Sequence, residues 1–299
     1  MTREAFGRAL ADIGENEKVF VIDTDEDVST KSEYFRAKYP GRFIQAGISE
    51  QNAVGVGAGL AASGKIPFVV SYACFLCSRG YDQIRMSAAI AKSNIRICGT
   101  HGGVGVGCDG PSHHAIDDIG LMRMLPDMTV VQPADSNEAR EIAKESVKFS
   151  GPLYIRLTRQ ALPDLVPHEF RIGKGVLLRE GCDVSVVATG SMVHEALKAA
   201  AILEKEGISA EVINIHTIKP IDTELLASSA KKTGCVVTCE DHGIGGLYSA
   251  VTEVLAERCP VPAKGIFVGG FTESGTCAEL YEKCGLTAES IAEAARSLR

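Results

Sequence analysis

The sequence predicts an α/β protein built from two parallel-sheet domains, and two observations point to this class. Short apolar runs alternate along the chain with amphipathic segments of helix length, a pattern typical of βαβ units with helices on both faces of a parallel sheet. The alternation pauses once and then restarts in a chain of 299 residues, which is longer than a single domain usually is. We therefore expect two three-layer domains in succession.

The first half contains five apolar runs that we expect to form strands. They are VFVID, IPFVVSY, NIRICGT, MTVVQP and PLYIRL, over 19–23, 66–72, 94–100, 128–133 and 152–157. Helices are expected between them over 49–62, 80–91 and 136–147. Because ligands of open parallel sheets lie beyond the carboxyl ends of the strands, the residues that follow these runs are the first candidates for a binding site.

The second half repeats this organisation after a polar, Pro-containing stretch over 158–175, which has no sustained periodicity and is typical of a linker. Strands are expected over 183–191, 208–216, 235–241 and 263–270, and helices over 192–206, 222–232, 246–257 and 287–298. The predicted division is a first domain over 1–165, a linker over 166–180 and a second domain over 181–299.

Composition excludes several classes of protein. The formal net charge of −7 argues against a general nucleic-acid binder, which needs a basic surface to neutralise phosphates. The start, MTREAFGRAL, lacks the apolar region of a signal peptide, and no run approaches the ~20 apolar residues that span a bilayer. We expect a cytoplasmic protein with no membrane segment, in which the ten cysteines are reduced and mostly structural.

Polar residues stand at the start of an otherwise small and apolar helix in GISEQNAVGVGAGLAASG. Ser49 is in a position to cap the helix, and an acidic residue in a first turn is favourable for the helix dipole whatever its function. However, the following residues predict a buried helix, and a carboxylate buried at its start needs a partner. Glu50 is therefore a candidate functional carboxylate as well as a capping residue.

The segment GTHGGVGVGCDGPSHHAIDD places six glycines, three histidines and three aspartates between a strand and a helix. Such a density of glycine permits close approach to a ligand, and binding groups gather on loops of this kind. A zinc site formed by His101, His113, His114 and Asp109 is the alternative, but it lacks the compact spacing of familiar zinc sites. The single C-x-x-C pair, Cys74 and Cys77, likewise has no second pair to complete a zinc site.

Aromatic and basic residues follow two other strands. Tyr72 and Phe75 could stack on a flat heterocycle, although core packing is the usual role of such residues. Arg156 and Arg159 could bind a phosphate in bidentate fashion. The sequence contains no G-x-G-x-x-G fingerprint opening a βαβ unit, no Walker A motif and no G-x-S-x-G elbow, so the common nucleotide-binding and hydrolase classes lack support.

Five segments together resemble the transketolases, in the order and context seen in that family. They are GISEQN, SRGYDQIRMSAA, THGGVGVGCDGPSHH, LPDMTVVQPAD and YIRLTRQALP. The resemblance covers the pyrimidine-binding domain over about 1–165, and the remainder is similar to the transketolase C-terminal domain. GISEQN alone would also fit related thiamine enzymes.

The resemblance implies a split enzyme. Full-length transketolases bind the diphosphate of thiamine diphosphate through a metal in a further N-terminal domain that contains a G-D-G motif, and no such motif occurs in this sequence. We expect that domain, with its Mg²⁺ or Ca²⁺, on a separate N-terminal transketolase subunit, in an α2β2 complex. This chain would then share thiamine diphosphate with its partner and bind no metal itself.

The matching positions imply roles on the cofactor side of the site. Glu50 resembles the Glu that hydrogen-bonds N1′ of the cofactor and promotes its imino tautomer, which requires a carboxyl group in a dry pocket. Tyr72 and Phe75 resemble the aromatic residues that pack against the aminopyrimidine, and Arg79 is assigned to the same side.

Other positions imply contacts with a sugar phosphate. His101 and His113 resemble the histidines that bind sugar hydroxyls and assist proton movement, and Asp109 resembles an Asp that contacts a sugar hydroxyl. The positions that hold the phosphate are matched by Arg3, Ser29 and Arg159. The sequence departs from many relatives at Cys108, where they have Glu, and the match around Asp23 and Asp25 is loose.

The implied activity is the transfer of a two-carbon ketol unit from a ketose phosphate to an aldose phosphate. A deoxyxylulose phosphate synthase and the β chain of a 2-oxo acid dehydrogenase share the fold and the catalytic Glu, and remain alternatives. Sugar phosphates are favoured over simple oxo acids by His101 together with Arg3, Ser29 and Arg159, because an oxo acid offers neither a dianion nor a row of hydroxyls. A non-catalytic assembly subunit is a further alternative, and His242 is expected to be structural.

Overall fold

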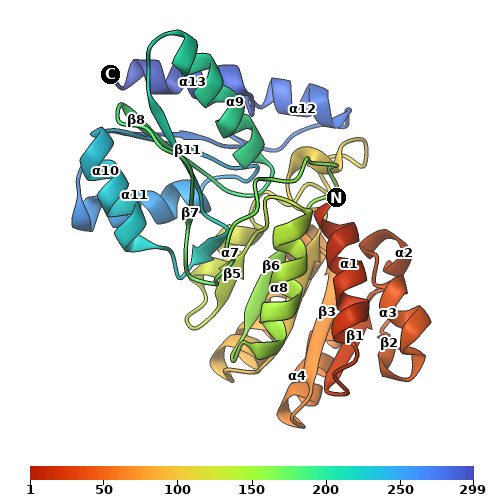
Figure 1. The fold of residues 1–299 in the computed structure, drawn as a ribbon. Helices are drawn as coiled ribbons and strands as arrows, with labels where there is room; N and C mark the ends of the chain where they lie inside the picture. Colours follow the sequence, from red (N-terminus) through yellow and green to blue (C-terminus); the bar gives the residue numbers. More distant parts are fainter.

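The computed structural model describes residues 1–299 and arranges them as two α/β units, one on top of the other (Figure 1). The first unit, coloured red to light green, forms the lower part of Figure 1, and the second, teal to blue, forms the upper part. Each has a mainly parallel sheet between two layers of helices, so the predicted fold class is confirmed. No helix has both the length and the apolar composition that crossing a bilayer requires.

The first sheet has seven strands in the order β10-β5-β6-β4-β3-β1-β2. All are parallel to their neighbours except β10, which is antiparallel to β5. Their bounds are β1 (Val19–Asp23), β2 (Phe43–Gln45), β3 (Ile66–Tyr72), β4 (Arg96–Thr100), β5 (Thr129–Val131), β6 (Leu153–Arg156) and β10 (Thr217–Lys219). The central strands are buried on both sides, which explains why they are apolar along nearly their whole length.

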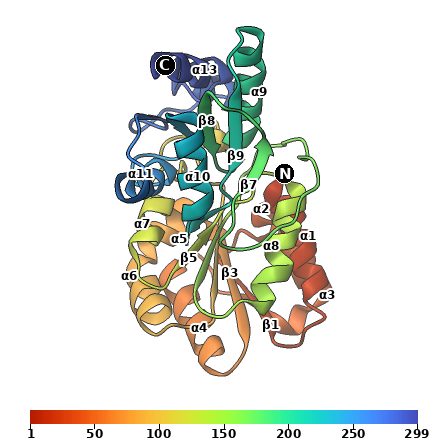
Figure 2. The same ribbon diagram turned by 60° about the vertical axis from the view of Figure 1, so that its left-hand side comes forward.

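Helices cover both faces of this sheet (Figure 2). One face packs against α1 (Thr2–Ile13), α3 (Glu33–Lys38) and α8 (Ser136–Lys148). The other packs against α4 (Glu50–Ala62), α5 (Ala73–Arg79), η2 (Ile84–Ile90) and α7 (Asp118–Met124). Short turns α2 (Asp27–Thr30), η1 (Pro40–Arg42), α6 (Tyr81–Gln83) and η3 (Val104–Val106) connect these elements.

The second sheet has five strands in the order β12-β11-β8-β9-β7. They are β7 (Val176–Arg179), β8 (Val184–Ala188), β9 (Ala210–Asn214), β11 (Val236–Cys239) and β12 (Ala263–Ile266). One face packs against α9 (Met192–Lys205) and α13 (Ala288–Ser297), and the other against α10 (Thr223–Thr233) and α11 (Leu247–Arg258). The remaining helix, α12 (Cys277–Lys283), packs against η3 of the first unit.

Two features differ from the sequence prediction and concern the connection of the units. The predicted linker over 166–180 contains β7, which pairs antiparallel with β9 as an edge strand of the second sheet. The second half also returns a strand to the first sheet, because β10 pairs with β5. The first sheet therefore includes a strand from the second half of the chain, and the second sheet begins within the predicted linker.

The segment over 80–91, predicted as one α-helix, is also different. It begins as α6 and continues through Ile90 as the π-helical η2. Widened turns of this kind are common at functional sites, and this one packs against α4, the helix that begins at Glu50.

Candidate active site at the carboxyl ends of the first sheet

The candidate residues gather at one edge of the first sheet because parallel strands bring their carboxyl ends together. Ser29 lies on α2 after β1, Tyr72 ends β3, and His101 follows β4 directly. Arg159 comes three residues after the end of β6, and Arg3 lies in the first turn of α1. The sheet thus joins side chains that are up to 156 positions apart in the sequence, as in the hydrogen bond between Thr2 and Thr158.

Glu50 is one of the buried carboxylates of this edge. Its side chain is 4% exposed, and Oε1 accepts a hydrogen bond from Arg79 at 2.9 Å. The guanidinium of Arg79 also lies over the ring of Phe75, 4.6 Å from its centroid. Because Arg79 is itself 53% exposed, water screens this ion pair and its stabilising effect is modest. The other carboxylate oxygen of Glu50 has no hydrogen bond within the chain and is available to a ligand.

Aromatic rings form a stack between Glu50 and the polar residues. The ring of Tyr72 lies parallel to that of Phe75, with centroids 5.8 Å apart. The ring of Tyr72 also stacks on the imidazole of His101, with centroids 3.8 Å apart. His113 meets the edge of Phe75 at 5.0 Å. The phenol oxygen of Tyr72 is 2.7 Å from the hydroxyl of Ser29, so the ring is fixed at both ends.

His101 is fully buried, and its hydrogen bonds define its tautomer. Thr100 donates its hydroxyl proton to the carbonyl oxygen of Ser71, so that hydroxyl must accept from Nδ1–H of His101, 2.8 Å away. Nε2 is then free to accept from Arg3 at 2.6 Å. Burial, followed by the charges of Arg3 and Arg159, lowers the pKa of His101 to about 3. The imidazole is therefore neutral at physiological pH. The backbone φ of His101 is 57°, which is unusual for a residue with a side chain.

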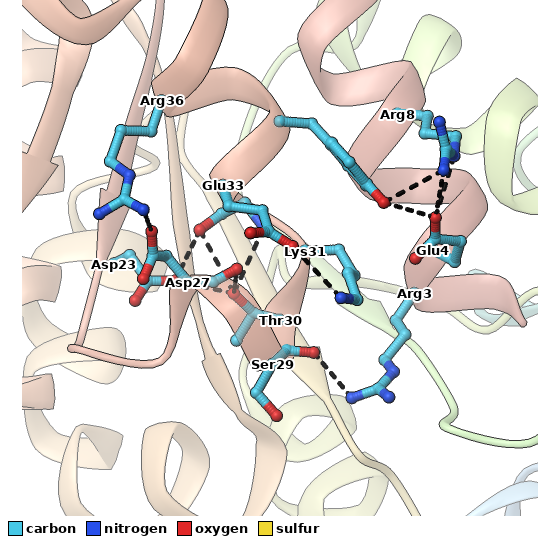
Figure 3. Close-up of polar contacts among 12 residues, drawn as sticks. Arg3, Glu4, Arg8, Asp23, Asp27, Ser29, Thr30, Lys31, Glu33 and Arg36 are labelled. Carbon is cyan, nitrogen blue, oxygen red and sulfur yellow. Dashed lines mark hydrogen bonds and ion pairs between the residues drawn. The ribbon is translucent and has the colours of Figure 1, made fainter.

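Arg3 reaches from α1 toward Ser29 on α2 (Figure 3). Its Nη1 donates to the carbonyl oxygen of Ser29 at 2.7 Å and to His101. Both acceptors are neutral, and the buried Nε has no hydrogen-bond partner. Burial and the charge of Arg159 lower the pKa of Arg3. Arg3 thus combines a partly desolvated positive charge with unused donors, which suits the binding of an anion.

The loop that carries Ser29 is organised by Asp23, which lies to the left of Ser29 in Figure 3. Asp23 is fully buried at the end of β1 and accepts hydrogen bonds from the hydroxyls of Thr30 and Ser32, both at 2.9 Å. It also accepts from the backbone N–H of Glu26 at 2.8 Å. Asp23 therefore shapes the loop, while Asp25 is exposed with φ of 71°.

Arg159 and Asp109 form the opposite side of the cluster. Their ion pair has a distance of 3.2 Å, with side chains 40% and 32% exposed. Arg159 also donates to the carbonyl oxygen of Val106 at 3.3 Å. Cys108 is exposed beside Asp109, its sulfur 3.8 Å from the carboxylate. The neighbouring charge of Arg159 is one cause of the lowered pKa of Arg3, so the two guanidinium groups belong to one electrostatic site.

The suggestion that Arg156 could bind phosphate is wrong. Arg156 is fully buried, and its Nε donates to Asp118 at 2.8 Å. Its Nη2 donates to the carbonyl oxygens of Ala115 and Asp241, at 2.8 and 3.0 Å. β6 directs this side chain into the junction of the two units, and only Arg159 reaches the site.

Two histidines have other structural contacts. The ring of His114 lies 2.5 Å from the hydroxyl of Thr272 and 3.0 Å from the carbonyl oxygen of Gly107, and so turns away from His101 and His113. Nε2 of His242, fully buried, accepts from the backbone N–H of Ile119 at 3.1 Å. No three His, Cys, Asp or Glu residues are grouped so as to hold a metal ion.

Sequence reasoning missed Glu26. Its carboxylate accepts hydrogen bonds from the backbone N–H of Tyr72 at 3.2 Å and from the hydroxyl of Ser71 at 3.3 Å. Burial raises its pKa to about 7, with further contributions from the charges of Asp23 and Glu50. The acidic run DTDED after a strand was a visible signal, but nothing in it distinguishes the residue that turns back toward β3 from those that face solvent.

Comparison with known families agrees with this architecture. Residues 1–164 match the family described as "Transketolase, pyrimidine binding domain", and residues 173–291 match "Transketolase, C-terminal domain". The first description implies thiamine diphosphate as the cofactor.

Individual relatives match over nearly their whole length. The 6-deoxy-6-sulfo-D-fructose transketolase subunit of Clostridium sp. strain MSTE9 is 43% identical, over 95% of this chain and 89% of the relative. One of the apulose-4-phosphate transketolase subunits of Phocaeicola vulgatus is 36% identical, over 98% and 96%. A solved structure described as a split gene transketolase, inactive beta4 tetramer, is 46% identical with a TM-score of 0.93, over 99% of this chain and 97% of that one. The chain belongs to the transketolase family, as the C-terminal section of the split, two-chain type.

Proposed function

We propose that this chain provides the pyrimidine-binding half of a thiamine diphosphate site and the anion-binding half of a sugar phosphate site. The reaction is the transfer of a two-carbon ketol unit from a ketose phosphate to an aldose phosphate. The observation that carries the proposal is the continuous cluster in which buried Glu50, stacked aromatic rings and unneutralised Arg3 adjoin one another. The first two suit a flat, basic heterocycle, and the third suits a phosphate.

The residues present fit the aminopyrimidine of the cofactor. Glu50 has one carboxylate oxygen held by Arg79 and the other without a partner, as needed for a hydrogen bond to a ring nitrogen. The ring of Phe75 is held in place by Arg79 over its face and by the ring of His113, so its position in the cluster is pre-organised. When bound, thiamine diphosphate supplies the carbon nucleophile and the electron sink for ketol cleavage.

The chain's own groups have distinct tasks in this proposal. Glu50 shares a proton with the pyrimidine through its buried carboxylate. His101, neutral with Nδ1–H on Thr100, presents Nε2 toward the substrate side. His113 and Asp109 bind sugar hydroxyls, and Arg3, Ser29 and Arg159 bind the terminal anion.

The anion and the sugar are open to variation within the family. One relative carries the name of a sulfonated fructose and another that of apulose 4-phosphate. Arg3 is paired with neutral acceptors, whereas Arg159 is already engaged by Asp109. We expect phosphate as the anion, because a dianion attracts both guanidinium groups more strongly than a monoanion does.

The proposed enzyme needs a second chain that holds the diphosphate and its Mg²⁺ or Ca²⁺. The similar solved structure, a tetramer of one chain type, is described as inactive, which supports the need for a partner. We propose an α2β2 complex, and we expect this chain alone to bind thiamine diphosphate weakly. Tight binding by the isolated chain, measured calorimetrically with Mg²⁺, would contradict the shared site.

The test is a Glu50→Gln variant in the complex with the partner subunit, assayed for ketol transfer between sugar phosphates. We expect a loss of roughly 100-fold or more, because a positioned proton-transfer group contributes about that much. Gln51→Ala is the matched control, since this neighbour is exposed on the same helical turn and should retain activity. Full activity of Glu50→Gln would favour a non-catalytic assembly subunit. Turnover of 2-oxo acids in place of sugar phosphates would favour a 2-oxo acid dehydrogenase-like chain.

A further inference from the structure

The glycine-rich loop over 101–117 is held by the C-terminal unit. The backbone N–H of Val104 donates to Oδ1 of Asp241 at 2.8 Å, and that of Gly105 lies 3.4 Å from Oδ2. Asp241 follows β11 at the end of the second sheet and is fully buried. A carboxylate of one unit therefore accepts hydrogen bonds from two successive amides of the other.

A second residue of the C-terminal unit completes this anchor. Tyr281, on α12, donates its phenol proton to Oδ2 of Asp241 at 2.7 Å. The same phenol oxygen is 2.8 Å from the hydroxyl of Ser191 and 3.1 Å from the side-chain oxygen of Gln160. Gln160 directly follows Arg159. Tyr281 therefore contacts the residue next to Arg159 as well as the carboxylate that holds the glycine-rich loop.

The loop is shaped to accept this carboxylate. Gly103 has φ of 82°, and a Cβ atom there would collide with the carboxylate of Asp241. Val104 is fully buried in the hydrophobic core of the C-terminal unit, together with Ala188 and Leu280. The turn η3 is thus inserted into the second unit, with its amides facing Asp241 and its first side chain in the core.

The anchored turn leads directly to the substrate side. The carbonyl oxygen of Val106, the last residue of η3, accepts from Arg159, and Asp109 in the same loop pairs with that guanidinium. His113, four residues beyond Asp109, contacts Phe75 and Tyr72. A displacement of η3 would therefore move both acceptors of Arg159.

We propose that Asp241, supported by Tyr281, is a positioning residue that sets the geometry of the substrate loop. This assigns a task to the C-terminal unit: it fixes the segment through which Arg159, Asp109 and His113 meet the sugar phosphate. The inference rests on the proposed function for its effect on substrate, but the anchoring of the loop is a property of this chain alone.

The first test needs no activity. Hydrogen–deuterium exchange of the full chain is measured for wild type and Asp241→Asn, whose amide nitrogen cannot accept from the second backbone donor. We expect amides over 102–107 to exchange roughly tenfold faster or more, as for the loss of a hydrogen bond to a charged acceptor, with exchange in β3 and β4 unchanged. Tyr281→Phe, which removes only a hydroxyl, is expected to affect the same segment and serves where Asp241→Asn does not fold.

Glu240→Gln is the matched control. Glu240 is the adjacent buried carboxylate, but it accepts from Leu247 and Tyr248 within its own unit and contacts no amide of η3. We expect the amides over 102–107 in Glu240→Gln to exchange at the wild-type rate. Unchanged exchange over 102–107 in Asp241→Asn, or in Tyr281→Phe if the first variant does not fold, would overturn the anchoring.

The second test is kinetic and uses the complex with the partner subunit. In Asp241→Asn the KM for sugar phosphates should rise about tenfold, while the affinity for thiamine diphosphate, read from the apparent cofactor dependence, stays that of wild type. Equal losses in cofactor affinity and KM would indicate general damage and overturn the positioning role. If the wild-type complex transfers no ketol unit at all, the proposed function fails, while the exchange experiment still decides whether Asp241 holds the loop.

Discussion

Arg3 and Arg8 lie on the same helix, yet only Arg8 has a carboxylate partner, Glu4 at 2.7 Å (Figure 3). Arg3 instead donates to a carbonyl oxygen and an imidazole. Because a guanidinium with unused donors binds an anion through charge-assisted hydrogen bonds, Arg3 is the direct probe of the proposed anion site.

Replacing Arg3 with Gln is expected to raise the KM for sugar phosphates by roughly 10- to 100-fold, the usual cost of losing a charged hydrogen bond. The KM for the same sugar without phosphate should change little. Steady-state kinetics of the complex with both sugars measures this contrast, and Arg8→Gln is the control. An equal loss for both sugars would mean that Arg3 does not recognise the anion.

Some of the site could be predicted from residues alone. Glu50 was recognisable because a carboxylate precedes a helix of small apolar residues, and His101 because a histidine opens a glycine-rich loop after a strand. Arg156 was misjudged because the sequence does not say whether an arginine at a strand end faces a ligand or a neighbouring domain. Glu26 was missed because its contacts, the N–H of Tyr72 and the hydroxyl of Ser71, are 45 or more positions away.

At the scale of elements, α8, β9 and the connecting segment meet at Glu138. Oε1 of Glu138 accepts from His168 at 2.8 Å and from Asn214 at 2.7 Å, while Oε2 accepts from the backbone of Ala134. The hydrogen bond between His168 and Glu138 is the main cause of the raised pKa of His168, which moves from 6.5 to about 9. The hydrogen bond between His168 and Glu138 attaches the segment that connects the two units to the first unit.

The contribution of His168 to the free energy of unfolding should decrease as the pH rises. Because its pKa is higher in the folded chain, the stabilisation is complete below pH 6.5 and is lost as the pH rises through 9. We expect His168→Ala to lower the free energy of unfolding by on the order of 2 kcal/mol at pH 6 and by far less at pH 10. Urea unfolding across this range tests it, with Arg171→Ala, an exposed residue of the same segment, as the control. A difference that stays constant with pH would contradict this account.

Strands that lie within longer apolar runs were predictable, including the three-residue β5, whereas β2, β10 and the helix α1 were not predicted. The runs that became β1, β3 and β4 are apolar because both faces of the sheet are covered. In contrast, β2 and β10 have three residues each, too few for any periodicity, and depend on tertiary pairing. α1 could have been found, since Ala5, Phe6, Ala9 and Leu10 line one buried face.

At the scale of the whole molecule, one fully buried ion pair of the first unit lies at its junction with the second unit. Asp118 accepts from Arg156 at 2.8 Å and from Tyr154 at 2.6 Å, and Arg156 also donates to the carbonyl oxygen of Asp241. The charge of Arg156 keeps the pKa of Asp118 below its ordinary value although burial acts in the opposite direction. Arg156 and Asp118 are therefore both charged, and both are buried away from water.

Arg156→Met should destabilise the chain by about 3–5 kcal/mol, because it leaves Asp118 as an unpaired buried charge. The measurement is chemical denaturation of the full chain. Arg296→Met, which breaks a surface pair with Glu206 whose side chains are 43% and 40% exposed, should cost at most about 1 kcal/mol. Similar small costs for both variants would show that the buried pair does not stabilise the chain.

The proposed thiamine diphosphate site forms only when this chain is together with a diphosphate-binding subunit. Native mass spectrometry of the chain, purified from its own cells in buffer with thiamine diphosphate and Mg²⁺, tests it most directly. We expect a heterotetramer of two copies of each chain that carries the cofactor. An assembly of this chain alone that binds the cofactor tightly and transfers ketol units would contradict it.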